Sequence, residues 1–285
     1  MKSAMKKSIS FGLAVVMLLI IWPVMNIPVS AALATTPMVA TGKFFTLALK
    51  FDGTVWAWGD NNHHQLGAGV EEEIGGSRRS YPVQVLGLTN VASIAAGREH
   101  AVALKSDGTV WCWGSAGNGQ FSGSTYGPFE SPTPVRISGL SNITAIAAGA
   151  YHTVALKSDG TVWLLGRGPN DNLNGTISPV KVPGLSGVTA ITMGLALKSD
   201  GTVWSWGYNN YGKLTSASAP ISGFSGIKAI VGGAGYAIEQ SYIAALKSDG
   251  TVWALGTNNN GQIGDGTTTN RPAPTRACHL KLDKH

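Results

Sequence analysis

An all-β fold made of five repeated units is predicted by three observations on this 285-residue sequence. The pentapeptide Asp-Gly-Thr-Val-Trp recurs at residues 52–56, 107–111, 159–163, 200–204 and 249–253. Stretches rich in β-branched residues flank each copy, and glycine-rich turns separate them, as is typical of short strands. The chain holds 38 glycines and only 13% charged residues, a composition that favours many tight turns.

The second repeat shows how one unit is organised. Residues 91–97 are small or β-branched and residues 100–105 follow them. Residues 109–114 come after an Asp-Gly turn, and residues 134–139 come after a polar loop. Asp-Gly between two such stretches is a strong hairpin signal. Successive pentapeptides lie 55, 52, 41 and 49 residues apart, and a period near fifty indicates a propeller or a solenoid. Four antiparallel strands in each period predict the blade of a β-propeller.

Residue size and proline predict the order of strands within a unit. The first stretch carries small residues, which suit a crowded central axis. The fourth stretch begins with proline in four units, and proline has no N–H to donate to a strand ladder. We therefore expect the fourth strand at the outer edge, beginning at Pro82, Pro134, Pro179 and Pro220.

Two positions of the third strand are predicted to fill the core between units. The second position lies two residues after the first, on the same strand face, and accepts tryptophan or leucine, as a volume-filling site does. A platform on which a ligand stacks is the alternative for these rings. The first position is occupied by Trp56, Trp111, Trp163, Trp204 and Trp253.

The first 34 residues are typical of a secretory signal peptide. Three lysines precede twelve apolar residues, Phe11–Trp22, and small residues follow, so cleavage is expected after Ala32 or Ala34. An uncleaved anchor is the alternative, although a membrane span needs about 20 apolar residues. Without this segment the formal charge falls from +6 to +3, which gives little support for nucleic-acid binding. The predicted location is outside the cell or on its surface.

Longer motifs around the pentapeptide resemble the RCC1 repeat, the repeat of the regulator of chromosome condensation. Residues 56–67 read Trp-x-Trp-Gly-x-Asn-x-x-x-Gln-Leu-Gly, and residues 256–267 are similar. The motif Ile-Ala-x-Gly-x-x-His occurs at 94–100 and 146–152. The resemblance covers residues 38–276 and implies a β-propeller, usually of seven blades.

The domain boundaries and the closure of the ring follow from this resemblance. Residues 35–280 are assigned to propeller repeats and residues 281–285 to a C-terminal tail. The fourth repeat lacks four residues before Leu195, and the glycine-rich pattern is lost after Pro274, where a sixth repeat is expected. Five repeats either tighten into a closed ring or form an incomplete seven-bladed ring. The repeat length favours the open arc, whose ends would associate with another chain.

The resemblance implies protein binding. The founder of the family exchanges nucleotide on a small GTPase at chromatin, a role that a signal peptide argues against. An exported bacterial group, which includes a propeller inhibitor of β-lactamase, binds its partner through loops on one face. This chain is similar to that group in the compact motif at 186–191 and 225–230.

Candidate binding residues lie in the loops between the first and second strands. One aligned series holds Phe45, His100, His152 and Tyr242, and we interpret it as a structural plug. The preceding residues vary from unit to unit, and variable loops on a fixed scaffold acquire specificity. The predicted binding residues are Phe44, Arg98, Glu99, Tyr151 and Tyr236.

Other features favour neither catalysis nor a bound cofactor or metal. The sequence has no nucleophile elbow and no phosphate-binding loop. His63 and His64 are interpreted as part of a solvated loop, and Cys112 as a small core residue. The charged insertion at residues 70–79 is expected to be solvated surface, or else a contact private to this protein.

The predicted function is therefore a secreted or cell-surface module, not an enzyme, that binds an extracellular protein through one propeller face. A carbohydrate or cell-wall binder, which would need flat exposed aromatic residues in a groove, is the first alternative. A truncated repeat protein without independent function is the second.

Overall fold

The computed structural model describes residues 35–69, 78–117, 119–121, 130–166, 176–206, 218–233 and 242–281. Within these ranges the chain forms strands, turns and loops, and none of the described residues lies in a helix. The same ranges accordingly contain no helix long and apolar enough to cross a membrane. The predicted signal peptide and its cleavage sites lie outside the described residues.

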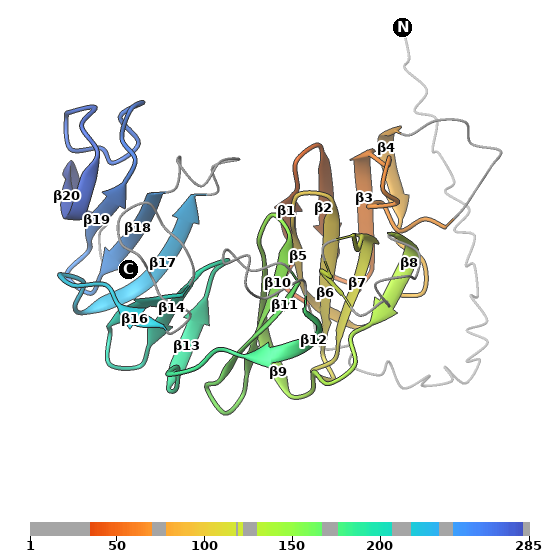
Figure 1. The fold of residues 1–285 in the computed structure, drawn as a ribbon. Helices are drawn as coiled ribbons and strands as arrows, with labels where there is room; N and C mark the ends of the chain where they lie inside the picture. Colours follow the sequence, from red (N-terminus) through yellow and green to blue (C-terminus); the bar gives the residue numbers. More distant parts are fainter. Residues whose placement is uncertain are drawn as a thin grey trace, which may run out of the picture. The chain divides into compact units, whose positions relative to one another are not determined.

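The described strands form five sheets of four, which we call blades 1 to 5 in chain order (Figure 1). Blade 1 contains β1 (Met38–Thr41), β2 (Phe45–Leu49), β3 (Val55–Asp60) and β4 (Arg78–Gln84). Blade 2 contains β5 (Val91–Ala96), β6 (His100–Lys105), β7 (Val110–Ser115) and β8 (Glu130–Arg136). Blade 3 contains β9 (Ile143–Ala148), β10 (His152–Lys157), β11 (Val162–Gly166) and β12 (Thr176–Lys181). Blade 4 contains β13 (Val188–Ile191), β14 (Leu195–Lys198), β15 (Val203–Ser205) and β16 (Ala219–Pro220). Blade 5 contains β17 (Ile227–Gly233), β18 (Tyr242–Lys247), β19 (Thr251–Gly256) and β20 (Arg271–Lys281).

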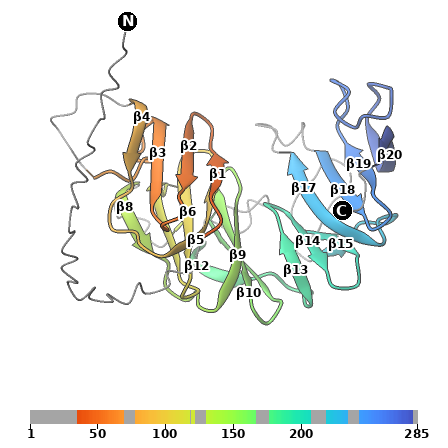
Figure 2. The same ribbon diagram turned by 180° about the vertical axis from the view of Figure 1, so that it is seen from behind.

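The topology is the predicted one. The four strands of each blade follow chain order, and every neighbouring pair is antiparallel (Figures 1 and 2). The first strands of consecutive blades contact one another, from β1 through β5, β9 and β13 to β17. This confirms the all-β class and the assignment of the small-residue strand to the inner position.

The repeated pentapeptide builds the same hairpin in every blade. In blade 2 the Asp107 carboxylate accepts hydrogen bonds from the Thr109 backbone N–H at 3.0 Å and hydroxyl at 2.6 Å. The Thr109 hydroxyl accepts one from Trp111 Nε1 at 3.2 Å, and Lys105 Nζ lies 5.6 Å from the Trp111 ring centroid. The hydrogen bonds to Thr109 lower the pKa of the Asp107 carboxyl. Gly108 has a φ of 77°, a conformation that favours glycine and explains the Asp-Gly pair.

An apolar cluster fills each of the four interfaces between consecutive blades. We call the face of a blade that is turned toward the next blade in the chain its forward face, and the opposite face its backward face. Each cluster joins the forward face of one blade to the backward face of the next. The forward face contributes, in blade 1, Leu47, Val55 and Ala57, and the backward face of blade 2 contributes Ala103 and Trp113. The third-strand residue between the two tryptophan positions is buried in every blade, as Ala57, Cys112, Leu164, Ser205 and Ala254.

The first tryptophan series is half-buried. Its ring packs against the interface cluster in four blades, as Trp111, Trp163, Trp204 and Trp253. A lysine Nζ also lies 4.2–5.6 Å from the centroid of each of these four rings. In blades 2 to 5 the second position is buried, with Trp113 0%, Leu165 1%, Trp206 6% and Leu255 3% exposed, whereas Trp58 of blade 1 is half-buried.

The prolines of the fourth strand require a correction. Pro82 and Pro134 lie inside β4 and β8, at places where the pairing with the third strand shifts register. A residue without an N–H is tolerated there because the ladder is interrupted. Pro220 lies two places further along its strand than Pro134 does. Pro220 pairs with Trp204, whereas the equivalent Trp111 pairs with Arg136, which is two residues after Pro134.

The stretch after Pro274 is also more regular than its sequence suggests. Its residues belong to β20, which runs to Lys281 and pairs with β19 to complete blade 5. In blade 4 the shortened segment before Leu195 forms a tight turn, in which the Thr192 N–H donates to the Leu195 carbonyl at 2.9 Å.

Candidate functional site

A structural plug fixes the loop between the first and second strands in blades 1, 2 and 3. In blade 2 the Gly97 N–H donates to the His100 carbonyl at 2.9 Å, and the His100 ring folds back over Gly97. A Cβ at Gly97 would lie 2.1 Å from His100 Cε1, so only glycine fits beneath the ring. Gly149 and His152 repeat this arrangement, and Phe45 takes the ring position in blade 1. The Phe45, His100 and His152 rings are buried, as expected for a plug, whereas Tyr242, the fourth member of the predicted series, is half-buried.

The two histidine plugs are held in the neutral state. Burial lowers the pKa of His100 to about 3 and also lowers the pKa of His152. His152 Nε2 lies 2.6 Å from the Met193 carbonyl of blade 4, and His100 Nε2 lies 3.4 Å from the Thr153 hydroxyl of blade 3. Each ring therefore contacts the next blade and helps to hold its loop in place.

Backbone hydrogen bonds join the loops of blades 1, 2 and 3. The Lys43 N–H donates to the Arg98 carbonyl at 3.0 Å, and the Arg98 N–H donates to the Ala150 carbonyl at 3.4 Å. Within blade 1 the Asp60 N–H donates to the Phe44 carbonyl at 2.8 Å, and within blade 2 the Ser115 N–H donates to the Glu99 carbonyl at 2.9 Å. The loops thus form one continuous surface, which we call the loop face.

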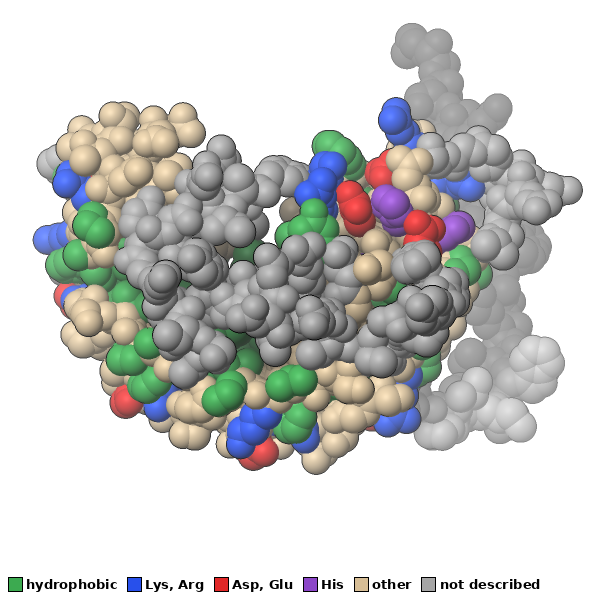
Figure 3. Space-filling view, viewed as in Figure 1, with side chains coloured by type: hydrophobic (Ala, Val, Ile, Leu, Met, Phe, Trp, Pro, Cys, Tyr) green, Lys and Arg blue, Asp and Glu red, His purple; other side chains and the backbone are tan. Residues whose placement is uncertain are grey.

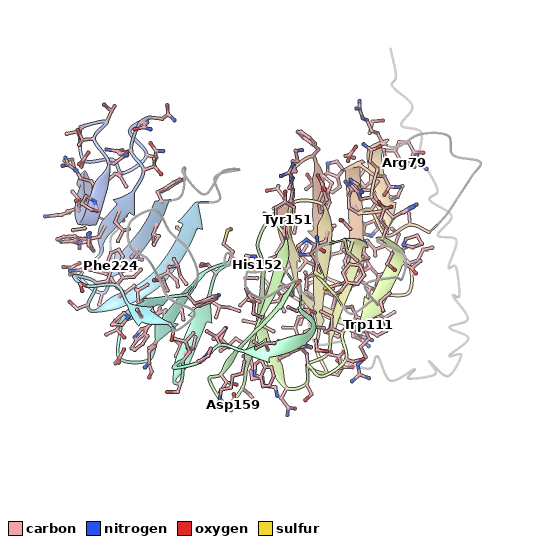
Figure 4. The ribbon with its side chains drawn as sticks, viewed as in Figure 1. Arg79, Trp111, Tyr151, His152, Asp159 and Phe224 are labelled. Atoms are coloured by element: carbon pink, nitrogen blue, oxygen red, sulfur yellow. The ribbon has the colours of Figure 1, made fainter. Side chains whose placement is uncertain are left out.

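Four of the predicted binding residues meet on this loop face. Arg98 Nη1 donates to the Tyr151 hydroxyl at 2.5 Å, and Arg98 Nε lies 3.3 Å from Glu99 Oε1. Lys43 Nζ lies 3.9 Å from the same carboxylate and 4.8 Å from the Phe44 ring centroid. Phe44 itself is 66% exposed. Figure 3 shows acidic, basic and histidine side chains gathered over the first blades, and Figure 4 places Tyr151 and Arg79 at the end of the strands opposite Asp159.

The loop face also contains two histidines that we assigned to a solvated loop. His63 Nδ1 lies 2.7 Å from Glu130 Oε1, and His63 Nε2 lies 3.6 Å from Glu99 Oε2. His64 Nε2 lies 3.6 Å from the other Glu130 oxygen. His63 thus bridges two carboxylates of the next blade. In the part of the chain that the structure describes, no group of three or more His, Cys, Asp or Glu residues has the arrangement of a metal site.

The predicted binding residues did not include Lys43, His63, His64 or Glu130, which are also members of this surface. The fifth predicted residue, Tyr236, and most of the charged insertion lie outside the described residues. One available signal was the position of His63 in the loop after the Trp-x-Trp-Gly motif, which opens at the same end of the blade as Phe44.

Comparison with known proteins agrees with this architecture. The family model described as the RCC1-like domain matches residues 23–284. The mitochondrial RCC1 domain-containing protein RUG3 of Arabidopsis thaliana is 32% identical over 163 residues, which cover 56% of this chain and 34% of that protein. The chain thus spans about a third of the length of this curated relative.

Two solved structures share the fold. Human WBSCR16 has a TM-score of 0.70 at 20% identity, over 85% of this chain and 67% of its own. Prp20p of Saccharomyces cerevisiae has a TM-score of 0.68 at 22% identity, over 87% of this chain and 66% of its own. The repeated motif, the five four-stranded blades and the family match agree, and the chain belongs to the family of RCC1-like domains.

Proposed function

We propose that this chain is a non-enzymatic module that binds a protein partner through the loop face. The observation that carries the proposal is the convergence of Phe44, Arg98, Glu99 and Tyr151 from three blades onto one surface with fixed loops. Aromatic and arginine side chains of this kind dominate binding energy in protein interfaces. Fixed loops reduce the entropy lost when a partner binds.

Proteins with a similar fold bind other proteins, which supports the proposal. Yeast RCC1 (Prp20) has been crystallised with Kap60 bound, and the structure of Prp20p was described together with its binding to Gsp1p and histones. The partner of the present chain is proposed to be an extracellular protein, as for the exported bacterial group with similar repeats. That proposal, and secretion to the cell exterior, are supported by residues 1–34, whose composition is typical of a signal peptide.

A glycan partner is less well supported by the described aromatic residues. Three of them are more than half exposed, Phe44 at 66%, Phe51 at 64% and Tyr81 at 55%. Phe44 precedes β2 and Phe51 follows it, so they lie at opposite ends of one strand. Tyr151 is engaged by Arg98. The arrangement suits a mixed protein contact better than a groove lined by flat rings.

Site-specific photocrosslinking tests this proposal with a matched control. The crosslinker p-benzoylphenylalanine is placed at residue 44 in one variant and at residue 51 in another, since both phenylalanines are similarly exposed. Each protein is irradiated with the medium and envelope fraction of the source organism. We expect a discrete protein product from position 44 and none from position 51. Identical products from both positions, or none from position 44, would contradict binding at the loop face.

We also propose that the two outer faces of the series associate with a second copy. Trp56 and Trp58 lie on the backward face of blade 1, and Leu246 and Val252 on the forward face of blade 5, all half-buried. Faces of these two kinds meet in each of the four interfaces within the chain. The outer faces are therefore complementary to one another.

A further inference from the structure

A pocket of about 400 Å³ lies at the end of blade 1 beside the loop face. Three segments build it: the loop before β2, the end of β3 and the start of β4. The lining residues are Phe44, Gly59, Asp60, Arg78, Arg79 and Ser80. The pocket thus combines an exposed aromatic ring with two guanidinium groups.

The aromatic side of the pocket is held in place by the backbone. Gly59 has a φ of 109°, and a Cβ there would lie 2.3 Å from the Phe44 carbonyl oxygen. Only glycine therefore lets the Phe44 loop approach β3 this closely. The Asp60 N–H completes the contact with a 2.8 Å hydrogen bond to the same carbonyl. The exposed Phe44 side chain is consequently held on a fixed backbone, so little conformational entropy of this loop is lost when a ligand binds.

One cation at the pocket, the Arg78 guanidinium, has no acidic partner among the described residues and can therefore bind an anion. The Asp60 carboxylate already accepts hydrogen bonds from Asn62 and Gln65, each at 2.8 Å. Arg78 is the cross-strand partner of Asp60, yet no ion pair joins them, and no other acid among the described residues pairs with Arg78. Arg78 is exposed at the start of an edge strand. By contrast, Arg98 is engaged by Glu99 and Tyr151.

We expect a partner to be recognised at this pocket through side-chain contacts, because the neighbouring edge strand β4 is a poor template for pairing with another strand. β4 contains Pro82, and its pairing with β3 shifts register between Ala57 and Gly59. Proline and such irregularities discourage the addition of a further strand at an edge. A partner would therefore be read through its side chains.

Building on the proposed function, we infer that this pocket receives a carboxylate side chain next to an aromatic or large apolar side chain of the protein partner. Arg78 would bind the carboxylate through its planar fork of N–H donors, the geometry in which arginine recognises carboxylates. Phe44 would pack against the neighbouring apolar side chain. The partner segment is acidic and apolar, such as a Phe-Glu-Glu sequence.

Fluorescence anisotropy with two labelled peptides tests this inference. The first peptide is Gly-Gly-Phe-Glu-Glu-Gly-Gly, and the second replaces both glutamates by glutamine. We expect the glutamate peptide to bind about tenfold more tightly, the size expected for one charge-assisted pair. Arg78→Gln should weaken the glutamate peptide about tenfold, and Phe44→Ala should weaken both peptides.

Two variants in blade 5 serve as matched controls. Lys228→Gln removes an exposed cation, and Val231→Ala truncates an apolar side chain that is 59% exposed, both on β17. Neither should change peptide affinity. Equal binding of the two peptides, unchanged binding by Arg78→Gln, or no binding of the glutamate peptide would overturn the inference. Photocrosslinking from position 44 reports on the proposed function separately, so the two failures are distinguishable.

Discussion

The interfaces inside the blade series and its two outer faces share a sequence pattern but differ in burial. Trp113, on the backward face of blade 2, is 0% exposed, whereas Trp58, at the equivalent position of blade 1, is half-buried. Val110, on the forward face of blade 2, is 0% exposed, whereas the equivalent Val252 of blade 5 is half-buried. The difference arises because blade 2 has a described neighbour on both sides.

This comparison shows that burial in the protein is supplied by the neighbouring repeat. A single blade has two apolar faces and cannot cover either of them by itself, as is general for repeat proteins. Identical residues therefore have different energetic weights along the chain. The ion pairs of the loop face also depend on the neighbouring blade, because they join side chains of consecutive blades.

The largest expected effect is the difference between two tryptophan substitutions. Trp113→Ala leaves a cavity in a filled interface and should lower the free energy of unfolding by about 3–5 kcal/mol. Trp58→Ala removes a half-buried ring that no described blade covers and should cost less than about 1.5 kcal/mol. Urea unfolding followed by circular dichroism measures both. Equal losses would mean that the backward face of blade 1 is as well covered as that of blade 2.

The His100 plug of blade 2 is expected to make the free energy of unfolding depend on pH, whereas the Phe45 plug of blade 1 has no group that titrates. His100 has a folded pKa of about 3 and an unfolded pKa near 6.5, so the unfolded chain binds a proton more readily. Stability from the neutral ring is complete above pH 6.5 and is lost as the pH falls, by about 2 kcal/mol at pH 5. Burial of His152 acts in the same direction.

Phenylalanine in place of His100 removes that contribution, since Phe45 already occupies the equivalent position in blade 1. We expect His100→Phe to show a smaller loss of unfolding free energy between pH 7.5 and pH 5 than the parent. Denaturant titrations at the two pH values measure this. A pH dependence unchanged by the substitution would exclude His100 as its source.

A smaller effect concerns association through the outer faces. Trp58→Glu places a charge on the backward face of blade 1, and it should weaken self-association about tenfold or more, because a charge is costly to bury. Phe51→Glu changes a residue that is 64% exposed in a turn and should leave association unchanged. Sedimentation velocity over a range of concentrations measures both. A parent protein that stays monomeric throughout would contradict association with a second copy.

Much of the fold could be predicted because the motif is local and repeated. The hairpin of each blade depends on five consecutive residues, so the pattern at residues 107–111 was enough to place two strands and their turn. The fourth strand was less predictable, since prolines mark an interruption in its pairing rather than its start. Pro220, two places out of register with the other prolines, illustrates this.

The candidate site was predicted only in part, for a physical reason. Phe44, Glu99 and Tyr151 share one loop position and Arg98 precedes it, so alignment of the repeats placed all four at one end of the blades. Their partners come from other segments: His63 and Glu130 are 67 residues apart in sequence. Proximity of that kind depends on how consecutive blades stack, which a repeat pattern does not specify.

Thiol labelling at two equivalent alanines tests most directly whether the neighbouring blade supplies the burial. Ala103 is 0% exposed inside the interface of blades 1 and 2, and Ala48 is the half-buried equivalent on the outer face of blade 1. Cysteine is introduced at each position in a chain carrying Cys278→Ser, which removes the exposed thiol. In native, dilute protein the thiol at 48 should react readily with a disulfide reagent, and the thiol at 103 only after unfolding. Equal protection of both thiols would contradict the account.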